Sequence, residues 1–164
     1  MLSVLQEKIA EAHGLAIAAA VVTEKVEAIV PDAGLRHDAR QLRSDAEETR
    51  RRCLELEERY GAEAAAEMLQ HANTTREKAA DLAGAWFGAG SGPLAAWSFL
   101  AMGEAAEVTV WSAVATLAAK SHGGRDAQVL AAWGLEVQTR HLETALRGAI
   151  RLAELADPDA PRWG

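Results

Sequence analysis

Five stretches of this chain repeat apolar or small residues at alternating spacings of three and four. This spacing puts the side chains on one face of an α-helix, and a stripe of several turns must be buried against another helix. Glycine or proline interrupts the pattern between the stretches, where a helix would end. Strand-type alternation is absent. We therefore predict an all-α protein with helices at about 2–30, 33–60, 62–87, 93–121 and 125–156.

The connections between these helices predict how they pack. Short connections follow the first and the fourth helix, which favours two antiparallel hairpins. The helix at 62–87 and the glycine-rich segment 88–92 then link the hairpins. Two hairpins joined in this way form the ferritin-like antiparallel four-helix bundle, here with an additional crossover helix between the second and the fourth helix. We expect residues 1–156 to form this single domain and residues 157–164 to form a flexible tail.

Charge and hydropathy restrict the partners of the chain. Its 164 residues carry a formal net charge of -7, so no basic surface is expected to bind nucleic-acid phosphates. The longest apolar run, 14–22, is well short of the roughly 20 residues that cross a bilayer. Cys53 is the only cysteine, which excludes an internal disulfide and fits a reducing compartment. We expect a cytoplasmic protein that binds neither nucleic acid nor membrane.

An acidic residue interrupts the stripe of the fourth helix. That stripe runs Trp97, Ala101, Glu104, Val108, Trp111 and Ala115. A bare buried carboxylate costs several kcal/mol, so Glu104 needs a metal ion, a cationic side chain or a proton. Arg140 occupies the centre of the last helix's predicted stripe, which runs Leu130, Trp133, Val137, Arg140 and Thr144. Both residues are about equally far from the connecting turn, which predicts a buried Glu104–Arg140 pair when no metal is bound.

Two segments resemble the small bacterial stress-associated ferritin-like proteins. Residues 45–49 read Asp-Ala-Glu-Glu-Thr, where the family reads approximately His-Leu-Glu-Glu-Thr. Residues 104–111 read Glu-Ala-Ala-Glu-Val-Thr-Val-Trp, where the family reads approximately Glu-His-Tyr-Glu-Ile-Ala-Ala-Tyr. Glu136 falls near the acidic pair of the family's last helix. The resemblance implies a ferritin-like fold, a stress-associated role, and inward-facing carboxylates and histidines that hold metal ions.

The candidate metal ligands are acidic and histidine residues on or near the inward faces. They are His13, Asp45, Glu104, Glu107, Glu136 and His141. Such oxygen and imidazole ligands suit iron or manganese, and also zinc. The chain has no Glu-x-x-His, the spacing typical of ferritin-like metal sites, so the predicted site is degenerate. Three of them also have an ordinary interpretation, as a hydrogen-bonded histidine at 13 and flanking charges at 45 and 107, whereas Glu104 cannot be a flanking charge.

A metal-free bundle is the alternative, and it would act by binding a small apolar ligand or another protein. The chain has five tryptophans against two phenylalanines and one tyrosine, and tryptophan lines both apolar pockets and interfaces. A homodimer is expected because ferritin-like bundles commonly associate, with Trp86 or Trp163 as contact residues. The charged run around Arg50–Arg52, including Glu57, is interpreted as a solvated helix face. The sequence leaves open whether the protein is an enzyme.

Overall fold

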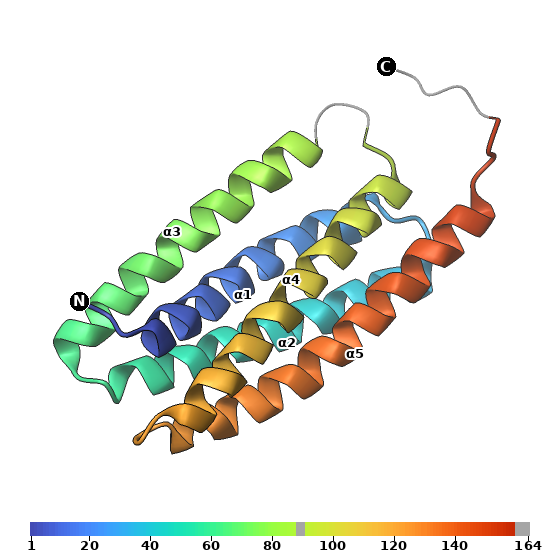
Figure 1. The fold of residues 1–164 in the computed structure, drawn as a ribbon. Coiled ribbons are helices and arrows are strands. Elements are labelled where there is room, and N and C mark those ends of the chain that lie inside the picture. Colours follow the sequence, from blue (N-terminus) through green and yellow to red (C-terminus); the bar gives the residue numbers. More distant parts are fainter. Residues whose placement is uncertain (88–90, 160–164) are drawn as a thin grey trace.

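The structure is a computed structural model that describes residues 1–87 and 91–159 (Figure 1). Within these ranges the only regular elements are five α-helices: α1 (Val4–Ile29), α2 (Ala33–Glu58), α3 (Ala62–Trp86), α4 (Pro93–Lys120) and α5 (Arg125–Leu155). Their bounds agree with the predicted ranges to within two residues, which confirms the all-α prediction. Most of the predicted glycine-rich link, most of the predicted tail, and Trp163 lie outside the described residues.

Local sequence sets where the helices begin. Ser3 and Gln6 form a capping box at the start of α1, in which each side chain bonds the other's backbone N–H. The Asp32 side chain accepts a hydrogen bond of 2.9 Å from the backbone of Leu35 and so caps α2. Pro93 occupies the first turn of α4, where its missing N–H costs nothing. These caps explain why the breaks in the sequence pattern mark the observed helix ends.

Consecutive helices run antiparallel, and α1, α2, α4 and α5 surround a common core (Figure 1). In this bundle α1 packs against α2 and α4, and α5 packs against α4 and α2. The remaining helix, α3, lies outside the four and packs mainly along α1 (Figure 1). The fold is therefore a helical bundle with one peripheral helix. Of the helices described, none is both long and apolar enough to cross a membrane.

The interior consists of two apolar clusters with polar residues between them. One cluster lies toward the α4–α5 turn and includes Ile9, Leu56 and Trp111. The other lies toward the α1–α2 turn and includes Val26 and Trp97. On α4 and on α5, the buried residues between the clusters include acidic, amide and histidine side chains. On these two helices the buried polar groups are thus confined to the middle of the bundle.

Two tryptophan–glycine contacts fix how α4 and α5 align. Trp97 packs on Gly148 so closely that a Cβ added there would lie 2.2 Å from the indole nitrogen. Trp111 packs on Gly134 in the same way, with a Cβ there 2.6 Å from the ring. The Trp97 indole also donates a hydrogen bond of 2.7 Å to the carbonyl of Ala145. Only glycine lets the backbone of α5 approach a tryptophan ring this closely, so these contacts determine the antiparallel register.

The tight contacts turn α5 by about one residue relative to the predicted stripe. Its buried line contains Gly134, His141 and Gly148, whereas Arg140 is exposed and Trp133 is only half-buried. On α4, the buried line includes Glu107, and Val108 is only partly covered. The predicted fifth stripe is thus right at Leu130 and Val137, which are buried, and wrong at Trp133, Arg140 and Thr144, where the neighbouring Gly134, His141 and Ala145 are buried instead.

The glycine contacts can be tested with a single methyl group. Gly148→Ala is expected to lower the free energy of unfolding by about 2–3 kcal/mol, since the added carbon overlaps the ring of Trp97. Gly103→Ala is the matched control on α4, where an added Cβ meets nothing within 4 Å. It should stabilise the fold by roughly 0.5–1 kcal/mol. Urea denaturation measures both, and a Gly148→Ala protein as stable as wild type would contradict the proposed packing.

Candidate functional site

Seven side chains form what we call the polar layer: five lie between the two apolar clusters, and the His13–Glu57 pair adjoins the cluster near the α4–α5 turn. All four helices of the bundle contribute, and six of the seven side chains are at most 4% exposed. The members are His13, Asp45, Glu57, Glu104, Glu107, Gln138 and His141. Burying several charged groups costs several kcal/mol each unless each is paired. The pairing within the layer therefore decides what chemistry it can perform.

His141 links three helices by placing a carboxylate at each of its ring nitrogens. Its Nε2 lies 3.0 Å from Asp45 Oδ2 on α2, and its Nδ1 lies 3.3 Å from Glu104 Oε2 on α4. Burial lowers the pKa of His141, but the two carboxylates raise it by more, so the net shift is upward. An imidazolium with both N–H groups directed at carboxylates is the state that this geometry favours.

The positive partner of Glu104 is thus His141, and the predicted Glu104–Arg140 pair does not form. Arg140 points outward and pairs with Glu136 one turn earlier on α5, at 3.2 Å. Glu136 is 73% exposed, so this predicted metal ligand does not reach the polar layer. The prediction placed a cation opposite Glu104 correctly but named the wrong residue, since α5 is turned by one position.

Glu107 is held by an amide rather than by a cation. Gln138 Nε2 donates a hydrogen bond of 2.7 Å to Glu107 Oε2. Burial raises the pKa of Glu107 well above 4.5, and the nearby charge of Glu104 raises it further. Oε1 of Gln138 has no hydrogen-bond donor among the described residues. The O–H group of a protonated Glu107 would supply one. Glu107 is therefore best described as a neutral carboxylic acid.

His13 and Glu57 form the third pair of the layer, between α1 and α2. His13 Nδ1 lies 3.0 Å from each oxygen of Glu57, and both side chains are buried. Glu57 was expected on a solvated face, which is wrong. Cys53 lies nearby, and burial raises the pKa of its thiol, helped by the charges of Glu57 and Glu107. A buried thiol with a raised pKa is a poor nucleophile.

These pairs are a poor fit for a metal centre. In the part of the chain that the structure describes, no three histidine, cysteine or acidic side chains converge as a metal-ligand set. The geometry of His141 gives the chemical reason, since both of its ring nitrogens already face carboxylates and neither is free to bind a metal. Five predicted ligands do lie in the polar layer, but each already has a partner there. These five are His13, Asp45, Glu104, Glu107 and His141. His141 faces Asp45 and Glu104, while His13 faces Glu57 and Glu107 accepts a hydrogen bond from Gln138.

An apolar cleft reaches the polar layer from the side of the bundle. It has a volume of about 250 Å³ and lies between α1, α3 and α4. We call it the α1–α3–α4 cleft. Its walls are aliphatic or aromatic, with Leu15, Val22, Leu82 and Phe99 among them. The polar side chains that line it are Glu104 and Glu107, which are almost fully buried and so lie at its inner end.

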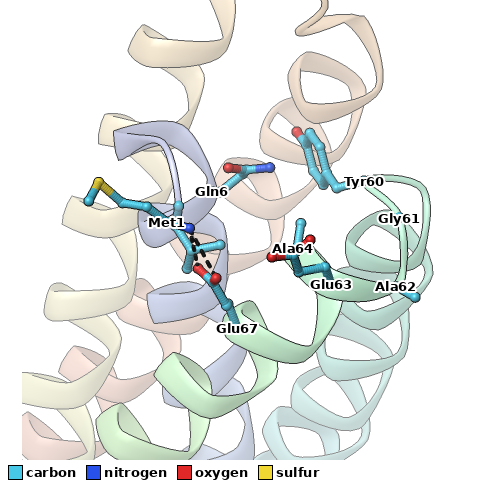
Figure 2. A pocket seen from close by; sticks show the side chains of 9 residues that line it. Met1, Gln6, Tyr60, Gly61, Ala62, Glu63, Ala64 and Glu67 are labelled. Atoms are coloured by element: carbon cyan, nitrogen blue, oxygen red, sulfur yellow. Dashed lines mark hydrogen bonds and ion pairs between the residues drawn. The ribbon is translucent and has the colours of Figure 1, made fainter.

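A second cavity lies at the end of the bundle, away from the polar layer. Its volume is about 450 Å³, and it lies between the start of α1 and the α2–α3 turn (Figure 2). Tyr60, Glu63 and Glu67 line it, and the amino group of Met1 pairs with Glu67 at 3.0 Å (Figure 2). No member of the polar layer lines this cavity. The smaller α1–α3–α4 cleft is therefore the better candidate for a binding site.

The comparisons with known proteins leave the site to be judged on its geometry. No protein-family model, no curated protein and no solved structure matches this chain.

Sequence reasoning missed two members of the polar layer. Gln138 precedes His141 by three residues, which is the Glu-x-x-His spacing with an amide in place of the acid. A search that allowed this replacement would have found it. Glu57 follows Leu56 at the edge of a buried stripe, four residues after Cys53. Its burial could have been inferred only with His13 recognised as its partner.

The neutral state of Glu107 predicts a distinctive pH dependence. Because its pKa is higher in the folded than in the unfolded chain, stability from this group is complete below pH 4.5 and is lost as the pH rises through the folded-state pKa. Glu107→Gln cannot release a proton. It should therefore equal wild type in stability near pH 4.5 and exceed it by about 1 kcal/mol or more at pH 7–8.

Urea denaturation of both proteins across this pH range measures the difference. His141 shifts in the same direction in both, so its contribution cancels. Glu136→Gln is the control, because this exposed residue should give a constant difference within about 0.5 kcal/mol. A Glu107→Gln protein less stable than wild type at pH 8 would show that Glu107 is ionised in the fold.

Proposed function

We propose that this protein is a ferritin-like helical bundle that binds a small, largely apolar molecule in the α1–α3–α4 cleft. The order of its helices supports the ferritin-like assignment. Hairpin α1–α2 and hairpin α4–α5 are joined by α3, which runs along the outside of the bundle from the end of one to the start of the other. In this arrangement α3 is the crossover helix. Side chains of α3 form one wall of the cleft, between α3 and α4.

One observation carries the proposed function: an apolar cavity ends at two buried carboxyl groups. Ligand sites in proteins are concave and mostly apolar, with a few polar groups that orient the ligand. The cleft has this composition, with hydrocarbon walls and Glu104 and Glu107 at its inner end. Its volume of about 250 Å³ suits a small ligand rather than a cofactor. No covalent chemistry is proposed, since the pKa of the nearby Cys53 thiol is raised.

A molecule of the right size tests this proposal directly. 1-Octanol should bind to the wild-type protein with a Kd on the order of 0.1–1 mM, as measured by calorimetry. Gly103→Leu should weaken binding at least tenfold, because Gly103 lines the cleft and the new side chain would fill part of it. Gly84→Leu is the matched control: Gly84 has the same open surroundings but does not line the cleft.

Two results would contradict the proposed site. One is a wild-type protein that does not bind 1-octanol at millimolar concentration. The other is a Gly103→Leu protein that binds as tightly as the Gly84→Leu protein. Circular dichroism should be the same for all three proteins, because an added Cβ at either glycine meets nothing within 4 Å.

A degenerate metal site in the same bundle is the second candidate, with iron or manganese as the ion. The observation that favours it is the spacing of the acids: Glu104 and Glu107 are one turn apart on α4, with His141 against Glu104. Metal binding would require His141 to leave at least one carboxylate, at the cost of at least one of its two ion contacts. In this candidate the protein would take part in a stress response, as the resemblance implies.

Metal analysis separates the two candidates. Protein purified without chelators and loaded with iron(II) should hold fewer than about 0.2 ions per chain after gel filtration, because the buried predicted ligands already have partners in the polar layer. Glu107→Gln should leave this value unchanged. A wild-type value near one ion per chain, lost in Glu107→Gln, would make the metal site the better assignment.

A further inference from the structure

The side chains that line the α1–α3–α4 cleft offer hydrogen-bond acceptors but no cationic or amide donor. Its lining consists of aliphatic residues, Phe99, Met102 and Gly103, with the carboxyl groups of Glu104 and Glu107 as the polar exception. The backbone groups in the middle of α1, α3 and α4 are already paired within the helices. The O–H of a neutral Glu107 is the one donor among the described side chains that line the cleft, and Oε1 of Gln138 needs it. An anionic or carbonyl head group would therefore be buried without a donor of its own, which is costly. A cationic head group would find two acceptors.

The charges around the inner end also favour an added cation. His141 is a single cation that faces two carboxylates, those of Asp45 and Glu104. Oε2 of Glu104 is buried against His141, and Oε2 of Glu107 accepts from Gln138, whereas the other oxygen of each acid accepts no hydrogen bond among the described residues. A buried carboxylate oxygen in this state can accept a hydrogen bond from a ligand without losing an existing one.

We infer, on the basis of the proposed function, that the ligand of this cleft is an apolar molecule with a primary ammonium head group that binds between Glu104 and Glu107. Its hydrocarbon part lies along Leu15, Val22 and Leu82, and its three N–H donors face the two carboxyl groups. The ligand class is thus an alkylamine or arylalkylamine rather than an alcohol, a carboxylic acid or an uncharged hydrocarbon.

Binding of such a ligand releases one proton, and the charges balance as follows. In the free protein burial and the charge of Glu104 raise the pKa of Glu107, which favours its neutral form. The ammonium keeps its own proton, because aliphatic amines stay protonated below about pH 9. Glu107 then gives its proton to solvent and faces the ammonium as a carboxylate, with the amide of Gln138 still bonded to it. Amine affinity should therefore rise with pH, by up to about tenfold per unit, until Glu107 is ionised in the free protein.

The groups around Glu107 allow this proton release to be assigned. On its own helix it faces Glu104, and on α5 it faces Gln138, with His141 behind Glu104. On α2 the nearby titratable groups are Cys53 and, beyond it, Glu57, which is paired with His13 of α1. Helices α1 and α3 contribute only apolar side chains to the cleft. The proton that ammonium binding displaces therefore comes from Glu107.

Three probes of equal chain length test the inference: octylamine, 1-octanol and octanoate. By calorimetry at pH 8, octylamine should bind wild type at least tenfold more tightly than 1-octanol, and octanoate should not bind. Titrations near pH 6 in two buffers of different ionisation enthalpy should show release of close to one proton per amine. Glu107→Gln should bind both neutral and cationic probes similarly, with no proton release. Glu136→Gln, the same substitution at an exposed position, should behave as wild type.

The outcomes separate the inference from the proposed function. If octylamine and 1-octanol bind wild type equally, the cleft is a ligand site but the ammonium assignment is wrong. If amine binding is tighter but unchanged in Glu107→Gln, the amine binds elsewhere on this acidic protein, and the inference is also wrong. If none of the probes binds, the proposed function itself fails. A preference for the amine that disappears in Glu107→Gln, but not in Glu136→Gln, supports the inference.

Discussion

The contact between α4 and α5 determines where every charge in the interior lies. Trp97, Glu104 and Trp111 are spaced by seven residues on α4, and Gly134, His141 and Gly148 have the same spacing on α5. Because the helices are antiparallel, the two tryptophan–glycine contacts flank the Glu104–His141 contact at equal distances along the bundle. A seven-residue repeat returns to the same face of a helix, so the three contacts form one continuous seam. Any change in this register would leave Glu104 buried without a cation.

The seam also explains which parts of the molecule could be predicted from the sequence. Helix ends followed from capping residues and glycine or proline breaks, because these act locally. The burial of Glu104 followed from its place in the stripe. The identity of its partner did not, because a helical stripe can be shifted by one residue with little change in its apolar content. Gly134 and Gly148 determine which face of α5 is buried. A glycine can be identified as a contact residue, however, only when the tryptophan opposite it is known.

Burying the side chains of the polar layer inside the bundle costs free energy. The paired histidines and acids at best offset the cost of removing their charges from water, and apolar residues of similar volume would often be as stable or more so. Glu107 is the clearest case, since burial and the charge of Glu104 raise its pKa well above that of a free carboxyl group. The pairs His13–Glu57 and His141–Asp45 cross between helices and so contribute to a unique arrangement of α1, α2 and α5. No such cross-helix ion pair accounts for Glu107.

What distinguishes Glu107 is the open space beside it. An acid retained only for structure should be surrounded by protein on all sides, as Glu57 is, with no exposed surface and a bidentate contact to His13. Glu107 instead lines a cleft whose other walls are mainly hydrocarbon. The small residues Ala18, Gly103 and Ala106 leave that cleft open. Larger apolar residues at these positions would close the cavity and stabilise the fold. A costly acid next to unfilled space is what a binding site requires, and the position of the space between α1, α3 and α4 gives α3 a role beyond connecting two hairpins.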